Sequence, residues 1–400
     1  MEQLMEYLLL CTFFLYLFSS VAFVMGINKG TEKAEDPKSR RWGNIAVGMS
    51  IIGVFFQLLF IITRVVIGGH WPTSNMFEFT AFLCFTIVIA FIVLFFMYRS
   101  AVLGAFVMPL AVILLAYASV FPHEVQPLIP ALQSYWLPVH VSTAALGQGA
   151  FGVGFVAGLI YLLHQFGKVK EGKNARWLEI TLVVVLMFVG FSVISLGFKA
   201  FHYEAKFSHV VDGQPAVQEY DVPPLVAPHD SEAIHIDSFL GLSKPLAEVP
   251  SWMKGKAAAS KFNGVLWGMI SGLILYGLIR LISRKPVREI LHPLVNRINP
   301  DLVEEISYRA IAIGFPIFTL GALIFAMIWA HEAWGRFWGW DPKEVWALIT
   351  WLFYSAYLHL RLSRGWHGVK SAWLAVGGFI IIMINLIVIN LVISGLHSYA

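Results

Sequence analysis

Charged residues are scarce in this chain of 400 residues. Asp, Glu, Lys and Arg make up 13% of it, whereas 58% is hydrophobic. A water-soluble domain carries about 25% charged residues, so this composition excludes an ordinary soluble protein and indicates an integral membrane protein. Cysteine is scarcer still: Cys11 and Cys84 lie in separate apolar runs, and no CxxC occurs. The sequence therefore predicts neither a thiol redox pair nor a thiolate metal site.

Other common signals are absent as well. The chain has no internal repeat, no low-complexity run and no phosphate-binding glycine loop. No small-residue cleavage pattern follows the first apolar run, so we expect that run to be a membrane helix and not a cleaved signal peptide. The lipid bilayer is the expected surrounding, and no nucleic-acid partner is expected.

Long apolar runs predict membrane-spanning helices, because each run approaches the ~20 residues that a helix needs to cross a bilayer. The expected fold class is an all-α polytopic membrane protein of about ten transmembrane helices, with both termini external and a small external insertion. The ten runs are 5–27, 42–64, 77–98, 101–120, 139–166, 177–200, 262–283, 310–330, 344–362 and 371–394.

Lysine and arginine set the expected orientation, because loops rich in these residues stay in the cytoplasm. The loops or ends near 28–41, 99, 168–176, 280–309 and 361–370 hold 19 of the 28 Lys and Arg residues. That set is predicted to be cytoplasmic. Both termini then face the external side.

Three domains are expected. Residues 1–200 hold the first six transmembrane helices, 201–261 form the polar external insertion, and 262–400 hold the last four helices. Turn signals in the insertion favour a hairpin over 207–220. In the third domain, 285–306 is expected to be an amphipathic element on the cytoplasmic surface, broken by Pro293 and Pro300.

Tryptophan is concentrated in residues 329–346, which lie on the predicted external side. Charged residues, Asp341 and Arg336 among them, are interleaved with the indoles. A buried helix does not carry so much charge, and a solvated loop does not carry so much indole. We therefore expect a shallow platform at the membrane surface for a flat aromatic ligand with anionic groups. The alternative is an ordinary interfacial aromatic belt. The five indoles are those of Trp329, Trp334, Trp338, Trp340 and Trp346.

The motif Trp334-Gly-x-x-Trp338-x-Trp340-Asp341-Pro-Lys-Glu344-x-Trp346 resembles the tryptophan-rich "WWD" signature of haem-handling proteins. Together with the segments on either side of this motif, the chain is similar to the CcsA/ResC family of cytochrome c biogenesis (System II). The matching segments occur in the same order as in the family and cover well over half of this chain. The other matching segments are Gly69-His70-Trp-Pro72-x-Ser-Asn75-x-x-Glu78, His140-Val-Ser142, Ser307-Tyr-Arg309, Gly314-Phe-Pro316, Tyr357-Leu-His359-Leu-Arg361 and Gly395-Leu-His397-Ser-Tyr399.

The resemblance implies three axial ligands for haem iron. His140 and His397 are the expected external pair, and two imidazoles suit a protein that holds haem without reacting it. Helical rise places His359 ~22 Å inward from Glu344, and the resemblance makes it a ligand of an inner haem site. In that family the second inner ligand belongs to the CcsB/ResB partner. From the residues alone, a single histidine at a helix end is more often an interfacial polar residue.

Three other histidines have lesser expected roles. His331 stands where asparagine is common in the family, and it is expected to be a hydrogen-bonding substitute and not a ligand. His70 is expected to pack around the platform. His164, near the cytoplasmic end of the fifth helix, is expected to be interfacial.

Cations and carboxylates near the platform complete the expected site. Arg64, Arg336 and Lys343 are the external cations available for the haem propionates, with lipid headgroups as the alternative contact. Asp341 and Glu344 are expected to orient indoles, backbone or cations.

The expected function is that of the haem-handling subunit of a cytochrome c synthase. Such a subunit moves haem b to the external side and presents it to the CxxCH cysteines of apocytochrome c, mainly by positioning. The expected partners are a CcsB/ResB-like membrane protein, apocytochrome c and a thioredoxin-like thiol reductant. The expected location is the cytoplasmic membrane of a bacterium or a thylakoid-type membrane. A b-type haem electron-transfer subunit and a secondary transporter are the alternatives.

Overall fold

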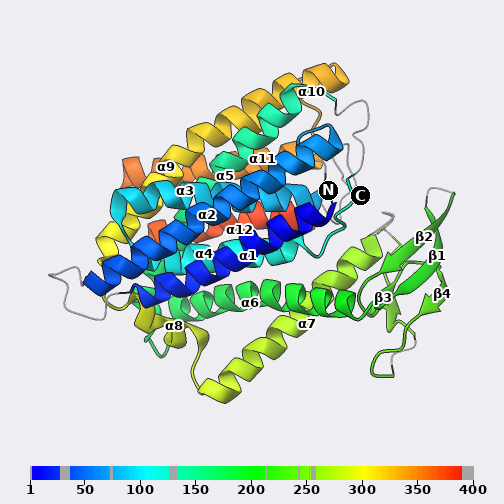
Figure 1. Ribbon diagram of the computed structural model, residues 1–400, viewed down its shortest axis with the longest axis horizontal. Coiled ribbons are helices and arrows are strands. Elements are labelled where there is room, and N and C mark those ends of the chain that lie inside the picture. The colour runs from blue at the N-terminus through cyan, green and yellow to red at the C-terminus, as the bar shows by residue number, and fades with distance from the viewer. Residues whose placement is uncertain are drawn as a thin grey trace. The chain divides into compact units, whose positions relative to one another are not determined.

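The apolar runs fold into helices because backbone surrounded by lipid must satisfy its hydrogen bonds within the chain. The computed structural model describes residues 2–27, 37–72, 75–125, 133–211, 214–241, 244–251, 253 and 258–389. Among these residues, nine helices are long and apolar enough to cross a membrane. The predicted all-α polytopic class is therefore confirmed (Figure 1).

The helices follow one another in the predicted order. They are α1 (Glu2–Met25), α2 (Pro37–Gly68), α3 (Met76–Tyr98), α4 (Ala101–Ala118), α5 (Trp136–Phe166), α6 (Lys173–Ala200), α7 (Ala258–Ser283), α8 (Val287–Val295), α9 (Pro300–Thr319), α10 (Ala326–Trp334), α11 (Pro342–Arg364) and α12 (Val369–Ile384). Two π-helical turns, η2 (Leu320–Phe325) and η3 (Asn385–Ile389), follow α9 and α12.

The tenth predicted run, 344–362, is α11, which is not among the nine most apolar helices. It has 23 residues, so its helical rise still gives ~35 Å, enough to cross the hydrocarbon core. Its ends lower its apolar character: Lys343 and Glu344 lie in the first turn, and Arg361 and Arg364 in the last.

The segment predicted as a broken amphipathic element is shorter than expected. Pro293 lies inside α8 and does not interrupt it. Pro300 begins α9, where Asn299 caps the helix by accepting the backbone N–H groups of Asp301 and Leu302. A proline at the first turn removes no helical hydrogen bond. The helix that starts there continues through η2 and α10 over 35 residues, so it contains the whole predicted span 310–330 and the ten residues before it.

Contacts divide the chain into two units, residues 1–178 with 288–382 and residues 179–287 with 383–400. In the first unit α5 is the most buried span and packs against α3 and α9. Its glycines permit the close approach, as expected for membrane helices. A Cβ on Gly147 would lie 2.6 Å from Phe318, and one on Gly149 would lie 2.7 Å from Thr86.

In the second unit α6 and α7 flank the predicted insertion. The hairpin is confirmed: β1 (Ala205–Val211) pairs antiparallel with β2 (Gln214–Tyr220). β4 (Glu232–Ile236) adds to β1, and a parallel pair is formed by β3 (Val226–Ala227) and β5 (Ala247–Glu248). Contacts group α6 and α7 with the insertion, whereas the expected boundaries at 200 and 261 separate them from it.

Side chains of α7 hold the insertion. The buried Asn263 amide accepts the backbone N–H of Leu225 at 2.8 Å and donates to the carbonyl of Pro223 at 3.1 Å. Trp267 donates its indole N–H to the same carbonyl at 2.7 Å. The segment between β2 and β3 is thus fixed to the helix that comes after the insertion.

Candidate functional site

The tryptophan-rich stretch forms the end of one helix, a short loop and the start of the next. α10 ends at Trp334, where Gly335 adopts φ +69° as the C-cap, a conformation that suits glycine. Asp341 caps α11 by accepting the backbone N–H of Lys343, and Glu344 accepts the backbone N–H groups of Asp341 at 3.2 Å and Gly339 at 2.7 Å. This capping box orients the loop backbone. Backbone orientation is one of the roles expected of the two carboxylates.

Four of the five indoles form two edge-to-face pairs. Trp329 is buried, and Trp334 meets it edge to face with ring centroids 4.7 Å apart. Trp338 and Trp340 make a second edge-to-face pair at 5.9 Å within the loop. Trp340 is 71% exposed and has φ +57°, an unfavourable backbone conformation for a bulky residue. The loop therefore presents an indole to the outside at a conformational cost, which points to a role outside the chain's own core.

His140 lies beside the buried indole of Trp329. Its ring stacks on Trp329 at a centroid distance of 5.8 Å and an angle of 10°. Its Nδ1 lies 2.8 Å from the carbonyl oxygen of Gly321 in η2. Because a carbonyl only accepts hydrogen bonds, Nδ1 carries the proton, and the lone pair of a neutral imidazole then lies on Nε2. This tautomer suits a metal ligand whose ring orientation is fixed by a hydrogen bond at the nitrogen that does not bind the metal.

His359 is exposed on α11. Ile349, Leu352 and Ala356 are exposed too, and their spacing places them on the same side of the helix as His359. The described residues of the first unit therefore leave this side of α11 uncovered. A single imidazole lies near one end of an otherwise apolar strip.

Arg361, two residues after His359, points the other way. Its guanidinium is buried, forms an ion pair with Glu304 of α9, and donates to the hydroxyl of Ser371 at 3.1 Å. Glu304 also accepts the backbone N–H of Gly368 at 2.8 Å. These contacts join α9, α11 and α12. Sequence reasoning missed Glu304, although an arginine inside a predicted span requires a buried acidic partner.

The two arginines expected at the propionates differ in setting. Arg64 is 2% exposed. Its Nε donates to Glu78 at 2.6 Å, and its terminal nitrogens donate to the carbonyls of His123 and Glu124 at 2.8 and 3.1 Å. Arg336 is exposed and lies over Gly339 of the tryptophan loop. Of the two, Arg336 is the one within reach of a ligand on the loop.

The remaining histidines of interest lie in different settings. His397 lies outside the described residues. His331 is exposed and stacks on Phe337 at 4.3 Å. The Nδ1 of His70 lies 2.9 Å from the carbonyl of Trp71, and His164 is half-buried at the end of α5.

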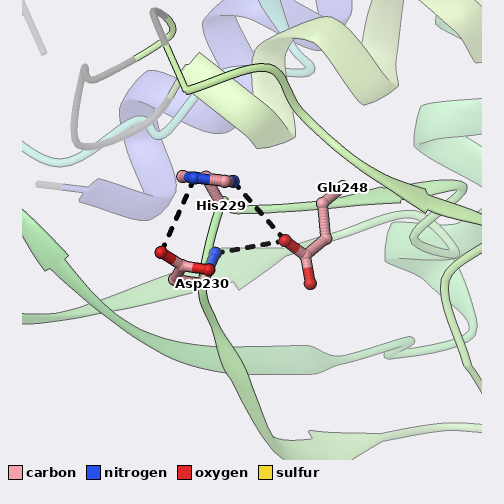
Figure 2. A group of neighbouring side chains, drawn as sticks. All are labelled: His229, Asp230 and Glu248. Carbon is pink, nitrogen blue, oxygen red and sulfur yellow. Dashed lines mark hydrogen bonds and ion pairs between the residues drawn. The ribbon is translucent and has the colours of Figure 1, made fainter.

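One group of metal-ligating side chains is found in the described part of the insertion. His229, Asp230 and Glu248 are exposed neighbours. Figure 2 shows the imidazole between the two carboxylates, with Nε2 3.5 Å from Asp230 and Nδ1 3.6 Å from Glu248. Because the carboxylates lie at different ring nitrogens, the arrangement suits a bridging imidazole better than three ligands around one ion.

The chain is similar to known proteins of cytochrome c assembly. The family model described as cytochrome C assembly protein matches residues 73–200 and 266–397. A cytochrome c biogenesis protein CcsA from Trichormus variabilis is 31% identical over 88% of this chain and 87% of its own length. The CcsA of Rippkaea orientalis is 31% identical over 90% and 92%, and that of Gloeobacter violaceus is 29% identical over 89% and 86%.

Proposed function

The chain belongs to the cytochrome c assembly protein family, and we propose that it is the haem-handling subunit of a cytochrome c synthase. It is a multi-pass protein of a bacterial or thylakoid-type membrane and acts in cytochrome c maturation. Its cargo in this proposal is haem b, taken up at an inner site that contains His359 and delivered to an external site that contains His140 and His397.

The observation that carries the proposal is the setting of His140. A protonated Nδ1 bonded to a backbone carbonyl places the lone pair of the neutral imidazole on Nε2, the atom that would ligate iron. The indole of Trp329 holds the ring on one face. In the same tryptophan-rich stretch as Trp329, the exposed Trp340 supplies an indole surface on which haem can stack, and Arg336 supplies a cation for a propionate.

Covalent attachment of haem needs cysteines from another protein. Attachment adds each of two thiol S–H groups across a haem vinyl C=C, which forms a C–S bond and needs no external oxidant. Cys84 is buried, and Cys11 lies in the α1 span. The acceptor in this proposal is therefore apocytochrome c with its CxxCH cysteines, kept reduced by a thioredoxin-like protein. The subunit contributes positioning of vinyl against thiol.

The exposed strip of α11 supports a membrane partner. An imidazole at this depth is costly when it faces lipid, and His359 lies on a side of α11 that the described chain leaves uncovered. We assign this side to a CcsB/ResB-like protein that contributes the second ligand of the inner haem. Arg64 has an indirect role in the proposed function, because its guanidinium binds the backbone carbonyls of residues 123 and 124.

Absorption spectroscopy of the purified protein tests the proposal. His140→Ala and His397→Ala should lower haem content or shift the spectrum, and added imidazole should partly restore both by refilling the axial position. His331→Ala is the matched control, since it removes an exposed imidazole from the same stretch. Loss of haem only in His331→Ala, or a wild-type spectrum in His140→Ala, would refute the ligand assignment.

A further inference from the structure

The bond to His140 comes from an irregular part of its neighbouring helix. Between α9 and α10 the chain makes the π-helical turn Leu320–Phe325. In this turn the carbonyl of Gly321 accepts the N–H of Ala326, five residues on, and also the Nδ1–H of His140 at 2.8 Å. A carbonyl oxygen has two lone pairs and can accept both.

Gly321 is also the point where this helix comes closest to α5. A Cβ on Gly321 would lie 2.2 Å from the backbone nitrogen of Ala144 and 2.6 Å from the carbonyl carbon of Thr143. These are backbone atoms, which cannot turn aside as a flexible side chain could. Only glycine therefore brings this carbonyl within hydrogen-bonding distance of a residue on α5, one turn before Ala144.

The wide turn also sets the direction of the residues after it. A π turn holds one residue more than an α turn, so these residues are rotated by about 100° relative to a continuous α-helix. With this rotation Trp329 of α10 stacks on the His140 ring at 10°. The same irregularity thus supplies the acceptor behind the ring and the indole on its face.

We infer that Gly321 and the π-helical turn around it are the positioning device for His140, holding it as the Nδ1–H tautomer with Nε2 directed to haem iron. This inference rests on the proposed function, in which His140 is an external haem ligand. Hydrogen bonds to the far nitrogen of a ligating histidine fix its tautomer, raise its basicity and contribute about 10–100-fold to metal affinity. Gly321 is a positioning residue, since it acts through His140.

Two variants and one control test the device in the purified, full-length chain. Gly321→Ala forces the helices apart at the bond, and deletion of the exposed Ile324 narrows the π turn to an α turn. Both should weaken ferric haem binding about 10–100-fold and raise the haem midpoint potential, because a less basic imidazole stabilises the ferric state less. Gly314→Ala is the control: its Cβ would crowd Ala150 and Gly147 in the same interface at 2.9 Å, but the residue makes no bond to His140.

The outcomes separate this inference from the proposed function. A wild-type potential in both variants, while His140→Ala still alters the haem spectrum, would overturn the positioning role alone. A potential shift as large in Gly314→Ala would overturn it as well. An unaltered spectrum in His140→Ala would instead remove the proposed function.

A measurement on the unchanged protein decides the matter if neither variant folds. Nitrogen-15 NMR of the histidine-labelled, haem-free chain reports which ring nitrogen carries the proton, with the His140 signal identified by its absence in His140→Gln. A neutral imidazole protonated at Nδ1 is expected. Protonation at Nε2 would overturn the inference.

Discussion

Arg361 of α11 pairs with Glu304 of α9, and this contact turns His359 to the outside of the chain. Residues two positions apart on a helix point about 200° apart, so one side chain of this pair faces the bundle while the other faces away. The buried ion pair and the exposed imidazole are therefore two results of one helix rotation.

Loss of the Glu304 carboxylate should destabilise the first unit. Glu304→Gln removes the nearer charge partner of the buried Arg361 guanidinium and leaves only Glu305, 3.9 Å away, so it should cost about 3 kcal/mol, the lower end of the range for buried pairs. Arg309→Gln, the neighbouring control, breaks the exposed pair with Glu305 and leaves both acidic partners of Arg361 in place, so it should cost about 0.5 kcal/mol. Equilibrium unfolding in detergent measures both. Equal losses in the two variants would contradict the structural role of the buried pair.

His359→Ala tests whether haem passes through the inner site. The helical rise separates His359 from the external platform by ~20 Å, so the two places cannot serve one iron without movement. If one path joins them, external haem should be depleted although His140 is intact. Full external haem in this variant, when haem is made only in the cytoplasm, would show that haem takes another route.

Trp340→Ala should have the opposite pattern. It removes exposed indole area from the loop, and with it the stacking energy for a flat ligand at the external site. External haem should fall several-fold while haem bound through His359 persists. The two pools are distinguished by their spectra in cells that contain and lack the ResB-like partner.

Surface labelling tests the orientation that the charge distribution predicts. Val217 in β2 and Ile290 in α8 are both exposed, which makes them suitable for single cysteines once Cys11 and Cys84 are replaced. A membrane-impermeant maleimide should label residue 217 from outside and leave residue 290 unlabelled. External reaction at 290 would reverse the orientation and every site assignment that depends on it.

The insertion should lose stability in mild acid. Burial lowers the pKa of His209 in β1 below the usual value, so the folded state binds this proton less readily than the unfolded state does. The stabilisation is complete above the unfolded pKa of about 6.5 and is lost as pH falls below it. The protection factors of the β1 amides, which are the intrinsic exchange rates divided by the measured rates at the same pH, should therefore fall between pH 7 and pH 5. His209→Gln should remove this dependence, whereas replacing the exposed His235 should not.

Much of the fold could be predicted because the relevant signals are local in the sequence. The order and approximate limits of the spans come from apolar runs, and the insertion hairpin comes from its turn residues. Gly147 and Gly154 of α5 each face a neighbouring helix, as small residues commonly do where membrane helices approach closely.

The features that could not be predicted depend on pairs of residues far apart in the chain. Nothing in the local sequence shows that Gly321 begins a wide turn whose carbonyl meets His140, 181 positions earlier. Likewise the sequence predicts Arg64 to be an external cation. Only the fold shows that its nitrogens donate hydrogen bonds to Glu78 and to two backbone carbonyls. The external ligand pair stays a prediction, and His397 lies outside the described residues.

The loop between Gly335 and Asp341 is held at both ends by helix caps. The two caps fix the length of this loop. A residue added or removed between them must change either the separation of α10 and α11 or the capping hydrogen bonds. We therefore expect the length of this loop to vary less among related chains than the identities of its residues. Evolutionary change at this surface should proceed by exchange of side chains on a backbone of constant length.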